Sequence, residues 1–124
     1  PLGDGRRIVC TVEPLDRDAF DAHCRARRRG DAAGEAWLDA DVLRRPLTAR
    51  PRRAGDAFVP LGAPGRQTVG DFLTNAKVPA ERRDRAVCVC DELGVIWVAP
   101  GRIDDRVKIT DATQRVVRLH LQAD

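Results

Sequence analysis

The chain contains no serine, no methionine and no tyrosine, and it has only two histidines. The missing serine rules out the G-x-S-x-G motif of serine hydrolases, and the phosphate-binding-loop, dinucleotide-binding and H-E-x-x-H motifs do not occur either. A pair made of a nucleophile and a general base is hard to assemble from what remains. We therefore expect no catalytic residue in this chain.

Long apolar segments are also missing. No run approaches the roughly 20 residues that cross a bilayer, and residues 1–5 lack the basic and then apolar pattern of a secretion signal. The sequence therefore predicts a cytoplasmic protein without a membrane partner. The first residue is proline instead of methionine, which suggests a fragment or a processed piece of a longer protein.

Aromatic residues are scarce, at 4% of the chain, whereas hydrophobic residues as a whole make up 43%. A chain of 124 residues can form one ordinary domain that buries about two thirds of its unfolded surface. Its core must be built mainly from valine, leucine, isoleucine and alanine. Several short strands, about three short helices and no repeated strand-helix-strand rhythm predict a small compact α+β domain of mixed strands.

Turn residues and apolar patterns divide the chain into predicted elements. Strands are predicted at residues 6–13, 35–39, 47–50, 86–90, 95–98 and 116–122, with a mixed loop and strand at 102–110. Helices are predicted from Asp16 to Arg28, from Thr68 to Ala76, and from Pro79 through Arg83. Asp16 and Thr68 are suited to cap their helices, because their side-chain oxygens accept hydrogen bonds from first-turn amides.

Four cysteines raise the alternative of a metal site. Cys10, Cys24, Cys88 and Cys90, together with His23, could surround a zinc ion, but paired C-x-x-C motifs are missing. Inert thiols are the preferred interpretation for a cytoplasmic chain, so no metal-binding residue is predicted.

Two further groups could carry chemistry, and both have simpler interpretations. His23 and His120 are isolated in sequence and are predicted to be solvated surface residues. Asp104 and Asp105 could hold magnesium, but adjacent side chains do not easily share a face. We interpret this pair as turn residues and as ion-pair partners of nearby arginines, namely Arg102 and Arg106.

Arginine is abundant. The net charge is +3, and all basic residues except Lys77 and Lys108 are arginine, with clusters within residues 25–29, 44–53 and 82–85. Guanidinium groups match phosphate oxygens and stack on bases, so arginines along an extended loop can follow an RNA backbone. The candidate RNA-binding residues are Arg50, Arg52, Arg53, Lys77, Arg82, Arg83 and Arg85. The alternative for each of them is a solvated surface charge without a ligand.

An ordered series of motifs runs through the later part of the chain. It consists of the arginine-rich step at 50–53, Gly55-Asp56, Phe58, Pro60-Leu61-Gly62, the helix at 68–76, Lys77-Val78-Pro79, Arg82-Arg83-Asp84, and Ile96-Trp97-Val98 with Gly101. Across residues 44–121 this series resembles the C-terminal domain of tRNA(Ile)-lysidine synthase. Cys88 and Cys90 depart from the family pattern, because aliphatic residues usually occupy those strand positions.

The resemblance implies a fold related to a domain of the phenylalanyl-tRNA synthetase β-chain. It also implies an enzyme that uses ATP, with magnesium, and lysine to convert a cytidine in the anticodon of tRNA(Ile) to lysidine. The Ser-Gly-Gly-x-Asp-Ser signature of the catalytic domain is absent here, so no cofactor is assigned to this chain. The expected partners are tRNA(Ile) and an N-terminal catalytic domain of the same protein.

Two hypotheses follow for the chain as a whole. Residues 1–45 are interpreted as an N-terminal strand-helix extension and connection, and residues 46–124 as the lysidine synthase C-terminal-like domain.

The first functional hypothesis is a tRNA-binding region that positions tRNA(Ile) for lysidine formation. The alternative is a structural docking module that packs on a catalytic domain without major RNA contact. An independent small enzyme is less favoured, because serine is missing and histidine is scarce.

Overall fold

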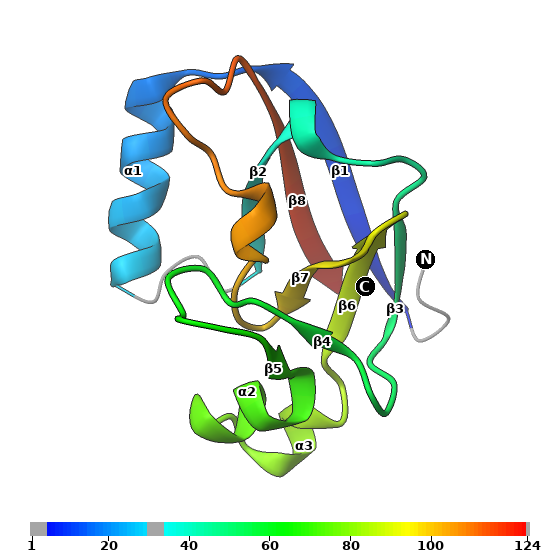
Figure 1. The fold of residues 1–124 in the computed structure, drawn as a ribbon. Helices are drawn as coiled ribbons and strands as arrows, with labels where there is room; N and C mark the ends of the chain where they lie inside the picture. Colours follow the sequence, from blue (N-terminus) through cyan, green and yellow to red (C-terminus); the bar gives the residue numbers. More distant parts are fainter. Residues whose placement is uncertain (1–4, 30–33, 124) are drawn as a thin grey trace.

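The fold, seen in a computed structural model that describes residues 5–29 and 34–123, combines short antiparallel sheets with three α-helices (Figure 1). A terminal sheet has the strand order β1-β8-β2, from β1 (Arg6–Pro14), β2 (Glu35–Asp39) and β8 (Arg115–Ala123). Both strand pairs of this sheet are antiparallel. The last strand of the chain therefore lies between two strands from its beginning, and residues on both sides of the predicted boundary at 45 share one sheet.

A central sheet has the order β3-β6-β7, from β3 (Thr48–Pro51), β6 (Val87–Asp91) and β7 (Gly94–Ala99). β6 and β7 form the predicted hairpin, with a register shift at Val89 and Cys90. A small two-stranded ladder pairs β4 (Ala57–Phe58) with β5 (Gln67–Thr68). The mixture of small sheets and helices confirms the predicted α+β class.

The helices begin where their capping residues predict. The carboxylate of Asp16 accepts hydrogen bonds from two first-turn amides of α1 (Arg17–Arg28), and the Thr68 hydroxyl accepts from the Asp71 amide at the start of α2 (Val69–Asn75). α3 (Ala80–Arg83) follows α2 after a short connection, and the two lie together at one end of the molecule (Figure 1). Short 3-10 turns, η1 (Ala40–Val42) and η2 (Asp105–Val107), complete the elements. Among the described helices, none has both the length and the apolar character needed to cross a bilayer.

The central hairpin is buried on both of its faces. One face joins a cluster with the terminal sheet, in which Ile96 and Trp97 pack with Leu38 and Val117. The other face joins a cluster with α2, in which Val98 packs with Phe58, Leu73 and other residues. Because the hairpin is covered on both sides, Val87–Asp91 is buried at every position. A strand buried on both faces has a nearly continuous apolar sequence, as this one does. The hairpin thus holds the terminal sheet and the helical end together.

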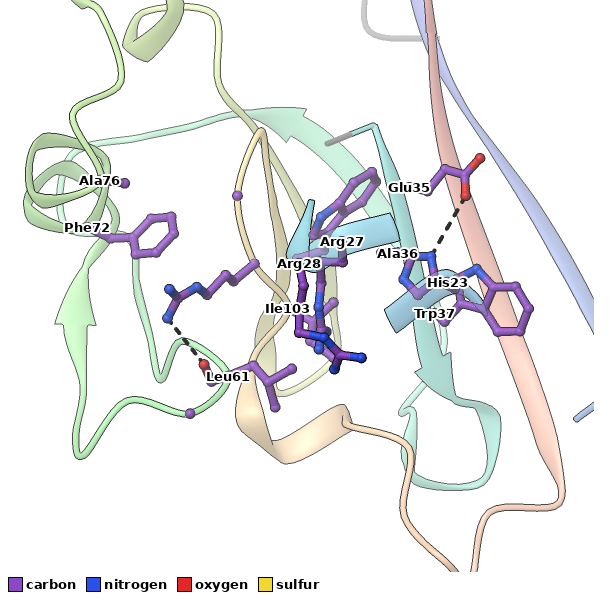
Figure 2. Close-up of a pocket in the computed structure, with 14 residues that line it drawn as sticks. His23, Arg27, Arg28, Glu35, Ala36, Trp37, Leu61, Phe72, Ala76 and Ile103 are labelled. Carbon is purple, nitrogen blue, oxygen red and sulfur yellow. Dashed lines mark hydrogen bonds and ion pairs between the residues drawn. The ribbon is translucent and has the colours of Figure 1, made fainter. Parts of the chain in front are cut away.

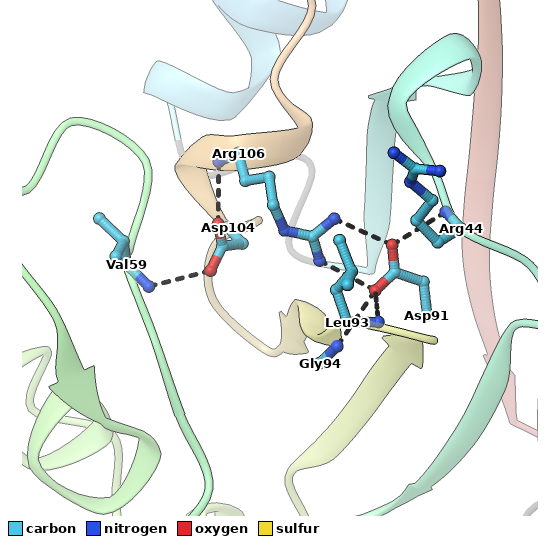
Figure 3. A network of polar contacts seen from close by, with 7 residues as sticks. All are labelled: Arg44, Val59, Asp91, Leu93, Gly94, Asp104 and Arg106. Atoms are coloured by element: carbon cyan, nitrogen blue, oxygen red, sulfur yellow. Dashed lines mark hydrogen bonds and ion pairs between the residues drawn. The ribbon is translucent and has the colours of Figure 1, made fainter.

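The segment at residues 102–110 was predicted to contain a strand, and this prediction is wrong. The described structure shows only isolated bridges there, from Ile103 to Trp97 and from Asp104 to Pro60, followed by η2. The Asp104 carboxylate ends the extended run, because it accepts hydrogen bonds from the amides of Val59 (3.0 Å) and Arg106 (2.8 Å) (Figure 3).

The buried carboxylate of Asp91 organises the neighbouring turn (Figure 3). It accepts two hydrogen bonds from the Arg106 guanidinium, at 2.9 and 3.0 Å. It also accepts from the backbone amides of Arg44, Leu93 and Gly94. Burial raises the pKa of Asp91, but these hydrogen bonds outweigh burial, so its pKa lies below the ordinary value.

The predicted ion pairs of Asp104 and Asp105 with Arg102 and Arg106 are therefore wrong. The Arg106 guanidinium pairs with Asp91, fifteen residues away in sequence. Asp105 pairs with Lys108 at 3.4 Å, and the Arg102 guanidinium donates to the carbonyl of Leu61 at 3.3 Å.

Gly101 lies where α2 packs against the end of the central hairpin. A Cβ at this position would lie 2.7 Å from Cε2 of Phe72 and 3.0 Å from the carbonyl oxygen of Val98, and the backbone φ is +151°. We expect Gly101→Ala to lower the free energy of unfolding by about 2 kcal/mol, because both the backbone and the buried Phe72 ring must shift. Urea unfolding followed by tryptophan emission measures the difference.

Gly65→Ala is the matched control for this prediction. A Cβ at Gly65 would meet nothing within 4 Å, and its φ is not positive. Its effect should stay within about 0.5 kcal/mol. Equal stability of the two variants would show that the close contact at Gly101 does not limit the fold.

Candidate nucleic-acid interface

Asp56 holds the first predicted RNA-binding segment in place. Its carboxylate oxygens lie 2.8 and 2.9 Å from the two terminal nitrogens of Arg50, and the Arg53 amide donates to it at 2.7 Å. The hydrogen bonds with Arg50 lower the pKa of Asp56 and raise the pKa of Arg50. Because both terminal nitrogens of Arg50 are engaged, this residue mainly fixes the shape of the loop.

Arg52 connects this loop to the helical end. Its backbone amide donates to the carbonyl of Ala86, and its Nε donates to the carbonyl of Arg83 at 2.9 Å. Its Nη1 packs against Gly70, at 3.4 Å from the position that a Cβ atom on Gly70 would occupy. Its Nη2 lies 3.9 Å from the Asp84 carboxylate. Arg52 therefore packs between α2 and the end of α3, with part of its charge neutralised.

The other predicted residues present cations around the same end of the molecule. Arg53, Lys77, Arg82 and Arg85 are exposed, and Arg83 is half-buried. Lys77 follows α2 in a left-handed backbone conformation, with φ of 59°, and its amide donates to the carbonyl of Thr74. We call these five residues the basic end. Its members come from the loop after β3, the connection between α2 and α3, α3 itself, and the segment leading into β6.

A pocket of about 650 Å³ lies beside the basic end and was not predicted from the sequence (Figure 2). Its lining comes from α1, β2, the Leu61-Gly62 turn, α2, β7 and the segment 101–103. The apolar part includes Trp37, Phe72, Trp97 and Ile103. The charged residues of the lining are Arg27, Arg28, Arg102 and Glu35. The arrangement combines an apolar floor with three guanidinium groups.

His23 occupies the inner wall of this pocket, so the prediction of a solvated histidine is wrong. It is buried, and its ring stacks on Trp37 with a centroid distance of 5.2 Å. Burial and the nearby Arg27 guanidinium lower its pKa below the ordinary value, against the opposing effect of the Glu35 carboxylate. Phe20 and His23 are three residues apart in a helix and therefore lie on the same face. This spacing was the sequence signal that His23 could be buried. His120 is exposed, as predicted.

The thiols of the central sheet are poorly suited to chemistry. Burial, together with the Asp56 carboxylate, raises the pKa of Cys88 to about 12, and burial also raises the pKa of Cys90. A protonated thiol is a poor nucleophile and a poor metal ligand. Among the described residues, no three His, Cys, Asp or Glu side chains are grouped in a way that could hold a metal ion.

Comparison with known protein families gives one match that covers most of the chain. The family model described as "TilS substrate C-terminal domain" matches residues 47–121. A tRNA(Ile)-lysidine synthase from Parabacteroides distasonis is 35% identical over 82 residues, which are 66% of this chain and 19% of that protein. The corresponding protein from Symbiobacterium thermophilum is 43% identical over 86 residues, 68% of this chain and 18% of that protein. The chain spans about a fifth of the length of these relatives.

Several solved structures share the fold. The crystal structure of a TilS C-terminal domain aligns with a TM-score of 0.70 and 24% identity, covering 99% of this chain and 88% of that chain. An N-terminal fragment of the phenylalanyl-tRNA synthetase β-subunit from Pyrococcus horikoshii aligns with a TM-score of 0.72 and 16% identity, covering 93% and 39%. At these identities the likeness concerns the fold, and both related folds are those predicted.

Proposed function

This chain belongs to the TilS substrate C-terminal domain family, and we propose that it is the tRNA-binding C-terminal region of a tRNA(Ile)-lysidine synthase. Its task is to hold tRNA(Ile) while a catalytic domain forms lysidine at the anticodon cytidine. The family assignment predicted from the motif series is confirmed by the match over residues 47–121. Binding of tRNA by this chain, and its location in the cytoplasm, are parts of the proposal.

The observation that carries the proposal is the basic end. Arg53, Lys77, Arg82 and Arg85 are exposed there, and no ion pair found among the described residues includes any of these side chains. Exposed guanidinium and ammonium groups at one end of a small domain suit the phosphate backbone of RNA. Phosphate contacts position a protein on its nucleic acid without reading sequence, which is the role expected of a holding domain.

Catalysis is proposed to lie elsewhere in the protein. The family implies ATP with magnesium, and the sequence has neither a Gly-rich phosphate loop nor the Ser-Gly-Gly-x-Asp-Ser signature of the catalytic domain. We therefore propose that ATP, magnesium and lysine bind to the catalytic domain. The residues of this chain bind and orient RNA and transfer no group.

A salt titration tests the proposal. If the chain contacts a handful of phosphates, the log-log slope of tRNA(Ile) affinity against salt concentration should be about three to six, because each neutralised phosphate releases counterions. Fluorescence anisotropy of labelled tRNA(Ile) gives the affinity at each salt concentration. Absence of binding at low ionic strength would contradict tRNA binding by this chain.

A second candidate function is docking on the catalytic domain. Leu93 is 64% exposed and Val42 is 40% exposed, and these are the large exposed hydrophobic residues of the described chain. Leu93 lies in the β6–β7 turn beside the Asp91 network, whereas the basic end lies with α2 and α3 (Figures 1 and 3). An apolar contact at Leu93 would therefore leave the basic end free, and the two functions are compatible.

A further inference from the structure

The pocket beside α1 is large enough for a ligand, and its lining differs from the residues of the basic end. Its volume of about 650 Å³ falls within the range of small-ligand sites, which runs from roughly 300 to 1,000 Å³. None of the residues predicted to bind RNA lines it. The pocket is built by segments that are far apart in sequence. Residues of α1 form one wall and Phe72 of α2 belongs to the opposite wall (Figure 2).

The charged lining favours an anion. Arg27, Arg28 and Arg102 are exposed, and Glu35 is the acidic residue of the lining. The Arg102 guanidinium donates one hydrogen bond to the Leu61 carbonyl, which fixes it at the mouth of the pocket. Planar guanidinium groups bind phosphate oxygens through paired donors, so three of them around one opening suit a phosphate.

The floor is apolar and aromatic. Trp37, Phe72 and Ile103 line it and are between 6% and 7% exposed, so the surface that they offer a ligand is small and apolar. Trp37 also carries a buried indole N–H for which no described residue provides an acceptor. Unpaired buried donors are rare in folded proteins, and a bound water, ion or ligand is a usual explanation.

The pocket and the basic end meet at neighbouring residues of the chain. Ala76 lines the pocket at the end of α2, and Lys77 is the next residue. Phe72 and Ala76 lie on the α2 side of the pocket in Figure 2, while His23 and Trp37 lie on the far side. We therefore expect an RNA strand whose phosphates contact Lys77 to pass close to the pocket.

We propose that this pocket binds one unpaired nucleotide of the RNA, with its base on the apolar floor and its phosphate against Arg27 and Arg28. An unpaired base suits the site because its faces and edges are free, whereas a base inside a duplex is stacked and cannot enter a pocket. The inference rests on the proposed function, since it assigns a second contact on the same RNA.

The two tryptophans of the chain provide a direct signal, because Trp37 and Trp97 both line the pocket. The experiment titrates the 124-residue chain with an unlabelled five-nucleotide single-stranded RNA and follows tryptophan emission. A saturable change in emission is expected. A longer blunt-ended RNA duplex that stays fully paired under the same conditions should give no change. An equal response to the duplex would overturn the inference.

Two pairs of variants locate the binding. Arg27→Glu should weaken binding of the five-nucleotide RNA about tenfold, because a hydrogen-bonded charge is replaced by a repulsive one. Arg25→Glu is its control, since Arg25 is exposed on the same helix and does not line the pocket. Ala76→Phe should obstruct the pocket, and Ala80→Phe, on exposed α3 outside the lining, should not. Equal affinities within both pairs would overturn the inference.

The outcomes separate this inference from the proposed function. Salt-dependent tRNA(Ile) binding without any emission change on adding the five-nucleotide RNA would overturn the pocket assignment and leave the tRNA-binding role standing. Pocket binding of the short RNA without tRNA(Ile) binding would support the pocket and contradict the holding role. An emission change with a glutamate-rich peptide, and none with RNA, would show a protein-binding pocket and overturn the inference.

Discussion

Replacing Asp91 with alanine should lower the free energy of unfolding by about 3 kcal/mol, which is a large part of the stability of a small domain. The carboxylate is 0% exposed and accepts five hydrogen bonds, two from Arg106 and three from backbone amides. Its removal leaves a charged guanidinium and three amides without their acceptor. Because the Arg106 side chain is 32% exposed and can recover water, the loss should fall at the lower end for a broken buried pair.

Urea unfolding measures this loss of stability. Two further variants test whether the loss comes from the Asp91 carboxylate. Asp91→Asn keeps one oxygen for the turn amides and removes the charge, so we expect an intermediate loss. Glu92→Ala changes the adjacent exposed residue and should stay within about 0.5 kcal/mol of the unaltered chain. If Asp91→Ala cost less than Glu92→Ala, the network in Figure 3 would not be what holds the turn.

Reversing three charges of the basic end should weaken tRNA(Ile) binding by roughly a hundredfold at low salt and reduce the salt slope by about three. The variant is Arg53→Glu, Lys77→Glu and Arg82→Glu. All three residues are exposed, so the fold should tolerate the change. Arg52 is left intact, because its bond to the Arg83 carbonyl supports α3. Anisotropy titrations with labelled tRNA(Ile) measure both quantities.

The control carries the same change in net charge at other places. It combines Arg25→Glu, Arg44→Glu and Arg115→Glu, three exposed arginines outside the basic end. A similar loss in both triple variants would indicate general attraction to a basic protein instead of a defined surface. An unchanged affinity in the basic-end variant would contradict the proposed surface and favour the docking function.

Local features of the fold could be predicted from the sequence, because they depend on neighbours a few residues apart. Asp16 and Thr68 cap their helices as expected, since the groups they bind lie two or three residues ahead. The hairpin of β6 and β7 is marked by its apolar runs around a turn. Residues 102–110 failed as a strand because the isolated bridges to Pro60 and Trp97 depend on the tertiary arrangement.

The candidate site was less predictable, because sequence alone does not show which cations are already paired. Arg50 and Arg53 look equivalent in the sequence, yet Asp56 engages the guanidinium of Arg50 and only the amide of Arg53. The pocket joins His23 to Phe72 across the fold, and no local pattern places these residues together. Most residues of the basic end belong to short basic runs and could be proposed as candidates from the sequence, and their contact with RNA stays a prediction.

The position of β8 between β1 and β2 affects how the protein is made. Arg6 pairs with Ala123, so neither N-terminal strand has its partner until the ribosome has completed residues 115–123. Closing a loop of this length costs chain entropy before the strand contacts compensate for it. The hairpin and α2 draw their contacts from a shorter stretch of chain and can pack earlier. We therefore expect assembly to run outward from the central hairpin, with the terminal sheet the last part to form.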